Sequence, residues 1–104
     1  MLEVPITPLD PYQGLNFETD EHTFHFNFQW LDEVEHWIMD TEALTTDFTV
    51  LGKLVVPGTN LWAPYAKRFG YLFVLGNERV PVSFESLGTS HILYWMGQSE
   101  IDEF

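Results

Sequence analysis

The chain has 104 residues, the length of one domain, and its 45% hydrophobic and 19% charged residues exclude a disordered composition. With a net charge of −12 and only four Lys and Arg residues, it lacks the positive charge that proteins use to bind nucleic acid or anionic membranes directly. It contains no cysteine, which excludes disulfides and thiolate zinc sites, and we expect neither a signal peptide nor a membrane span because no apolar run approaches ~18 residues.

The charges are unevenly placed along the chain. Residues 1–52 carry eleven Asp and Glu residues and no Lys or Arg, whereas every basic residue lies between Lys53 and Arg79. This polarity favours head-to-tail contacts or docking on a basic partner. A solvated acidic surface that maintains solubility explains the same pattern.

Alternation of apolar and polar residues predicts strands in the first half of the chain. The clearest is His22–Trp30, in which three Phe residues and Trp30 point one way and polar residues point the other. A sheet with one buried and one wet face produces this period of two, and a helix does not. Gly52 marks a hairpin position or a bulge in a later strand. The further strands predicted in this half cover residues 2–6, 15–19, 35–40 and 47–56.

The second half of the chain begins with a strong breaker, Pro57-Gly58. After it, Thr59 or Asn60 can cap one short helix or 3₁₀ segment near residues 60–69, and Gly70 can end it. A proline within this segment limits it to one or two turns.

The remaining segments complete a mostly β fold. Residues 71–75 are predicted as a buried strand and residues 90–96 as the last strand, whereas a proline restricts residues 79–84 to an edge strand or a loop. Residues 98–104 are expected to be a flexible acidic tail. About seven short strands separated by turns predict a small antiparallel β-barrel or sandwich that occupies residues 1–104 as a single domain.

We find no motif for catalysis, phosphate binding or metal binding. Ser90 and His91 are neighbours, so a strand would place them on opposite faces, and the same holds for the spacing of His22 and His25. The acidic residues lack the calcium-loop pattern, and paired carboxylates without a cleft give glycoside hydrolysis no support. We therefore expect no enzyme activity, no cofactor and no metal site, which leaves an interaction surface.

The interface candidates are large aromatic residues and the basic residues beside them. Three of the rings share one face of a short helix because they are three and four residues apart. A Trp that faces outward from the last strand and the final residue of the tail are further candidates. The full set is Trp62, Tyr65, Lys67, Arg68, Phe69, Trp95 and Phe104. In the alternative interpretation, the helical rings cover one open end of a barrel.

Several segments, taken in order, resemble a known family. They are Trp37–Asp40, Leu51–Leu61, Ala63–Tyr65, Phe69-Gly70, Phe84–Gly88 and Leu93–Trp95. Their order is similar to that of the small baseplate plug proteins of contractile-tailed phages, described for cyanophages. The opening Val4–Pro8 is similar to the family's Ile-Pro-Leu-Thr-Pro with one residue pair inverted. The most specific stretch, Leu-Val-x-Gly-x-Asn-Leu-Leu-x-Tyr, departs here by placing Trp62 at the second leucine and by adding Pro64.

The resemblance spans nearly the whole chain and implies a non-enzymatic, plug-like structural component of a contractile-tail baseplate. The implied partners on the tail axis are hub, spike and tail-tube proteins, together with further copies of the chain. The implied location is the virion, after synthesis in the host cytoplasm, and no catalytic residue carries over. In such a location, the acidic residues of the 1–52 half would line a channel through which DNA slides, or would contact a basic partner.

Two other classes of function stay open on the residues alone. A stand-alone β-sandwich binding module would use exposed Trp and Tyr rings to hold a carbohydrate or protein ligand. A small barrel enzyme would use two carboxylates.

Overall fold

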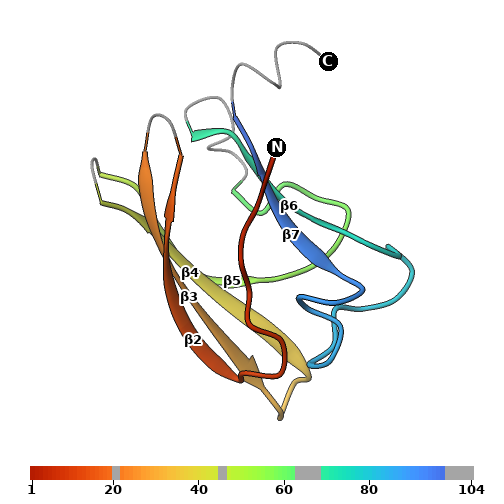
Figure 1. The fold of residues 1–104 in the computed structure, drawn as a ribbon. Helices are drawn as coiled ribbons and strands as arrows, with labels where there is room; N and C mark the ends of the chain where they lie inside the picture. The colour runs from red at the N-terminus through yellow and green to blue at the C-terminus, as the bar shows by residue number, and fades with distance from the viewer. Residues whose placement is uncertain (20–21, 45–46, 63–68, 98–104) are drawn as a thin grey trace.

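A computed structural model describes residues 1–19, 22–44, 47–62 and 69–97 (Figure 1). This part of the chain contains seven strands, which confirms the mostly β prediction. They are β1 (Leu2–Glu3), β2 (Tyr12–Glu18), β3 (Thr23–Leu31), β4 (His36–Ala43), β5 (Thr49–Leu54), β6 (Tyr71–Leu75) and β7 (Ile92–Met96). The helix expected near residues 60–69 falls mostly outside the described residues, and the expected tail, residues 98–104, falls wholly outside them.

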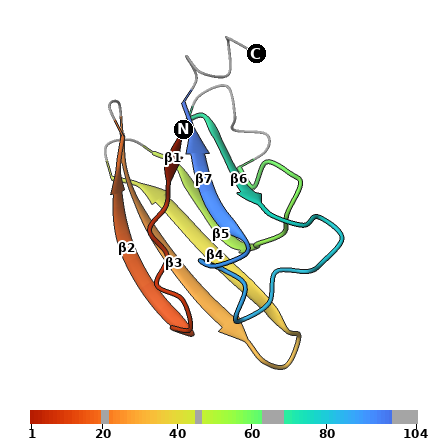
Figure 2. The same ribbon diagram turned by 45° about the vertical axis from the view of Figure 1, so that its right-hand side comes forward.

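The strands form two antiparallel sheets that face each other. One sheet has the order β2-β3-β4-β5, and the other has the order β1-β7-β6. Figure 2 shows β1 beside β7, with the four-stranded sheet forming the second layer. Each described strand pairs only within its own sheet, so the fold is a sandwich and the barrel alternative is wrong.

The alternation of β3 determines which face of the larger sheet is buried. Phe24, Phe26 and Phe28 are fully buried, while the residues between them are half-buried or exposed. Opposite residues in an antiparallel pair share a face, and Phe26 pairs with Thr41 while Phe28 pairs with Met39. Thr41 and Met39 are buried as well, so β3 and β4 turn the same face toward the other sheet.

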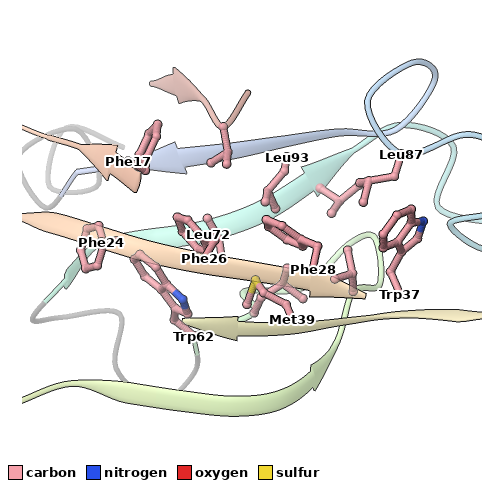
Figure 3. Close-up of a cluster of buried hydrophobic side chains, with 14 of the residues drawn as sticks. Phe17, Phe24, Phe26, Phe28, Trp37, Met39, Trp62, Leu72, Leu87 and Leu93 are labelled. Atoms are coloured by element: carbon pink, nitrogen blue, oxygen red, sulfur yellow. The ribbon is translucent and has the colours of Figure 1, made fainter. Parts of the chain in front are cut away.

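The core between the sheets is dominated by aromatic rings (Figure 3). Trp62, from the connection between β5 and β6, lies 4.9 Å from Phe24 and nearly parallel to Phe26 at 6.2 Å between ring centroids. At the other end, Trp37 stacks on Phe84 at 5.9 Å, and its Nε1 donates a hydrogen bond to the Ser83 carbonyl. Each such ring pair contributes about 0.5–1.5 kcal/mol beyond the burial of its surface.

Gly52 occupies a β-bulge, one of the two forms predicted for it. The register between β4 and β5 shifts between Met39 and Thr41, and Gly52 has a φ of 66°. Its N–H donates to the Asp40 carboxylate at 2.7 Å, which holds the extra residue in place.

Residues 79–84 form a loop, as one of the two alternatives predicted. Pro81 has no N–H with which to continue a ladder. The loop nevertheless closes one end of the sandwich, because Val82 is buried and Phe84 packs against the core.

Replacing one core ring should test the role of β3. We expect Phe26→Ala to lower the free energy of unfolding by about 3–5 kcal/mol, because it removes a buried ring and leaves a cavity. Tyr12→Ala, on the neighbouring strand with a side chain that is 67% exposed, should change it by no more than about 0.5 kcal/mol. Urea unfolding of both variants measures the difference, and equal losses would contradict the sandwich core.

Gly70 and Gly52 offer a matched comparison of a crowded and an open glycine. Both have positive φ, but an added Cβ at Gly70 would lie 2.3 Å from the Met96 carbonyl oxygen, whereas at Gly52 nothing lies within 4 Å. Gly52→Ala should cost about 1 kcal/mol for the left-handed backbone alone. Gly70→Ala should cost at least ~2 kcal/mol more because β7 backbone must move. Urea midpoints that rank the two variants in the opposite order would refute this packing.

Candidate interface

A two-layer sandwich buries one face of each sheet, so the outer faces are its largest surfaces for contact. Residues paired directly across an antiparallel ladder point to the same side, so the register shows which side chains make up each outer face. The two outer faces differ sharply in composition.

The outer face of the four-stranded sheet, the large-sheet face, is mainly polar. Its side chains include Tyr12, Asn16, Glu18, His25, Asn27, Gln29, Ile38, Asp40, Glu42, Thr49 and Leu54. His25 Nδ1 lies 2.7 Å from Asn16 Oδ1, which fits ordinary wet-face hydrogen bonding. A shallow hollow of about 130 Å³ lies over Asn27, Asp40 and Glu42. Among the described residues, no group of three or more His, Cys, Asp or Glu side chains is placed to hold a metal ion.

A serine–histidine pair does occur, but between residues that the sequence analysis did not connect. His91 Nδ1 lies 2.9 Å from Ser86 Oγ, and Nε2 lies 3.1 Å from the Asn77 carbonyl oxygen. Because that carbonyl can only accept, His91 donates to it from Nε2 and shares a second hydrogen bond with the Ser86 hydroxyl at Nδ1. The His91 residue is 2% exposed, and Ser86 Oγ also accepts the Ser83 N–H. The pair therefore ties the 77–91 connection together within the protein rather than facing a substrate.

The outer face of the three-stranded sheet is apolar. We call it the small-sheet face; it consists of the paired residues Tyr71 and Met96, Phe73 and Tyr94, and Leu75 and Ile92. None of the six belongs to the core or packs against it. Tyr71 is 39% and Leu75 46% exposed, and the rings of Phe73 and Tyr94 lie 6.3 Å apart. Three aromatic rings and three aliphatic or thioether side chains thus cover one surface.

The predicted interface residues that the structure describes, Trp62, Phe69 and Trp95, are not on this face. Trp62 is 0% and Phe69 2% exposed, so both are core residues of the free chain, as expected if their segment covers the core. Trp95 is half-buried and points inward with Leu93, and its Nε1 donates to the Phe69 carbonyl at 2.9 Å. The other candidates, Tyr65, Lys67, Arg68 and Phe104, lie outside the described residues. An interface role for the seven candidates stays a prediction.

A signal for the small-sheet face was present in the sequence. Residues 71–75 and 92–96 are uninterrupted apolar runs, which are typical of strands covered on both sides. The sandwich covers only one side of each, through the buried side chains of Leu72, Val74 and Leu93. The outer side therefore keeps the composition of an interior without the second layer that would bury it.

The most specific stretch of the family resemblance connects the two sheets. Asn60 Oδ1 accepts the N–H of Trp62 at 3.1 Å and that of Leu72 at 3.2 Å, while the Leu61 N–H donates to the Leu72 carbonyl. One amide oxygen thus holds the turn that inserts Trp62 and also attaches that turn to the edge of β6. This explains why an Asn occurs in the stretch in this chain.

Fold and surfaces together define a small two-sheet β-sandwich with one mainly polar and one apolar outer face, whose described buried polar pairs hold its own loops. Comparison with protein families then identifies which structural protein it is. A family model described as "Cyanophage baseplate Pam3 plug gp18" matches residues 1–98. The chain belongs to this baseplate plug family, which makes it a structural virion protein of the phage tail baseplate.

The other findings add little to this identification. No curated protein matches the chain. In the part of the chain that the structure describes, no helix has the length and hydropathy needed to cross a membrane. The family match confirms the resemblance that the motif order indicated.

Removing the amide of Asn60 should loosen the link between the sheets. We expect Asn60→Ala to lower the free energy of unfolding by about 1–3 kcal/mol, because two backbone N–H groups lose their acceptor. Asn77→Ala, which removes the acceptor of a single exposed N–H, should cost less. Urea unfolding measures the free energy of unfolding of both variants. If both are as stable as the parent protein, the Asn60 side chain does not stabilise the turn, and the prediction is wrong.

Proposed function

We propose that this protein is a non-enzymatic plug that is bound near the hub, spike and tail tube on the axis of a contractile-tail baseplate. Its partners are hub, spike and tail-tube proteins, and further copies of itself are a second kind of neighbour. In this proposal residues 1–104 act as a single domain, made in the host cytoplasm and then assembled into the virion.

The observation that carries this proposal is the family match over residues 1–98. The match covers every described strand, so it concerns the whole sandwich rather than a local motif. The surface chemistry is consistent with it. The one close serine–histidine pair among the described residues is enclosed, and the large apolar surface suits protein contacts better than turnover.

The net charge of −12 has a use on the tail axis. DNA passing the plug carries one negative charge per phosphate, and a strongly acidic protein repels it. The large-sheet face carries Glu18, Asp40 and Glu42 and is the more polar of the two outer faces. We propose that this face points toward the passage, which leaves the small-sheet face for protein contacts.

The alternative of a carbohydrate-binding module is less well supported. Such a module would stack a sugar on exposed Trp and Tyr rings. The two exposed Tyr residues among those described, Tyr12 and Tyr71, lie on different sheets and do not form one platform. Trp37 and Trp62 are buried, and Trp30 and Trp95 are half-buried and pack against the core. The chain therefore presents no fully exposed Trp platform.

Reconstruction of the virion tests the proposed location. We expect density that fits the two-sheet sandwich on the tail axis next to the hub and spike, and its loss in virions from a phage in which the gene is deleted. Assembly of the remaining baseplate in those virions provides the control. Density for the sandwich at the periphery, or its absence from the baseplate, would overturn the axial position.

A further inference from the structure

We propose that the small-sheet face is the surface by which this protein docks on a heterologous partner, one that presents apolar side chains surrounded by Lys and Arg. The inference rests on the proposed baseplate role, because it names the contact surface and the chemistry of the partner. It concerns six residues that were not among the interface candidates: Tyr71, Phe73, Leu75, Ile92, Tyr94 and Met96.

The first argument is the cost of leaving such a face in water. Large aromatic and aliphatic side chains occupy every outward position of β6 and β7, whereas the large-sheet face mixes apolar residues with charged and amide side chains. The face is exposed at Tyr71 and Leu75 and half-buried at its other four residues, so it is a contiguous apolar surface in contact with water. Such a surface on a folded domain marks a contact site. Aromatic residues supply most of the binding energy in such sites, and here Phe73 and Tyr94 are paired at the centre of the sheet.

The margin of the face has the shape and charge of an interface rim. Along β6, a hollow of about 260 Å³ is lined by Tyr71, Phe73, Leu75 and Glu78, together with Gly58. A recess beside exposed rings can receive a partner's side chain. On the opposite edge, Glu3 of β1 is paired with Tyr94. The apolar centre is thus bordered by a carboxylate on each side.

Charge complementarity selects the partner. The strands β1, β6 and β7 contain no Lys or Arg. Among the described residues, the basic residue nearest to them in sequence is Arg79, which follows Glu78 in the turn after β6, while Arg68, three residues before β6, lies outside the described residues. A partner with apolar side chains at its centre would bury the rings of the face, and Lys or Arg residues around that centre would form ion pairs with Glu3 and Glu78. The basic groups would also offset a net charge of −12, which otherwise opposes close approach to another acidic surface.

The same charges disfavour a second copy of this chain as the occupant. A twofold contact brings the same patch together from both chains, so the acidic borders would face one another. Each chain would also bring its own −12 charge to the interface. A heterologous basic partner has neither disadvantage.

The test measures incorporation into virions of a phage in which the gene is deleted and supplied on a plasmid. Quantitative mass spectrometry gives the amount of this protein per tail-tube protein. We expect the double variant Phe73→Ser with Tyr94→Ser to lower incorporation at least tenfold, because it removes the central rings. Tyr12→Ser with Leu51→Ser, at residues 67% and 73% exposed on the other sheet, is the matched control and should incorporate like the parent protein.

A charge-reversal pair tests the partner's chemistry without touching the rings. We expect Glu3→Lys with Glu78→Lys to lower incorporation at least about fivefold, since both side chains border the face. Glu18→Lys with Glu42→Lys makes the same change of net charge on the large-sheet face and should have a smaller effect. This pair also keeps the test decisive if the serine variant fails to fold, which thermal unfolding of the purified proteins will show.

The outcomes separate this inference from the proposed function. Absence of the unaltered protein from virions would overturn the baseplate role and this inference with it. Normal incorporation of both small-sheet variants, in virions that do contain the unaltered protein, would overturn this inference alone. If the unaltered protein is a dimer in solution and the double variant Phe73→Ser with Tyr94→Ser is a monomer, the face binds a second copy of the chain instead. Stronger binding of a hydrophobic dye after truncation at Gly97 would assign it to the chain's own C-terminal segment.

Discussion

The structure depends on the packing of Phe24, Phe26 and Phe28 against the second sheet. These rings project from the same side of β3, which lies between β2 and β4 in the larger sheet. They cannot be buried by their own sheet, so a second layer is required. That layer consists of β1, β7 and β6, and the connection that precedes β6 adds Trp62 between the layers. A small chain thereby obtains an extensive aromatic core.

The same arrangement makes contact surfaces unavoidable. Two layers bury two faces and leave two outside. In this chain the outer faces are chemically unequal: the larger is rich in carboxylate, amide and imidazole groups, and the smaller is almost wholly apolar. For a structural protein of a baseplate, unequal faces allow one side to bind neighbours while the other meets water or a passing polymer.

Polar groups inside this protein hold connections in place. Asn60 links the turn before Trp62 to the edge of β6. His91 and Ser86 join two parts of the loop before β7, and the Trp37 indole N–H reaches the Ser83 carbonyl. Such groups are satisfied within the fold, so their presence in the sequence indicates loop structure rather than chemistry. The contact surface that we propose consists instead of aromatic, aliphatic and thioether side chains.

The sequence by itself determined the strands, because the period of two in His22–Trp30 follows from the pleat of a single strand. The order of its motifs was also sufficient to indicate the baseplate plug family. Only the tertiary structure decided which surfaces are exposed. Residues 71–75 and 92–96 show no alternation of apolar and polar residues, so the sequence does not tell which of their side chains are buried. Their burial depends on whether another layer packs on one side of the sheet or on both. The local spacing of Trp62 allowed both a place at an interface and a place over the core. Only the tertiary structure showed that it is buried, because the sheets that enclose it come from distant parts of the chain.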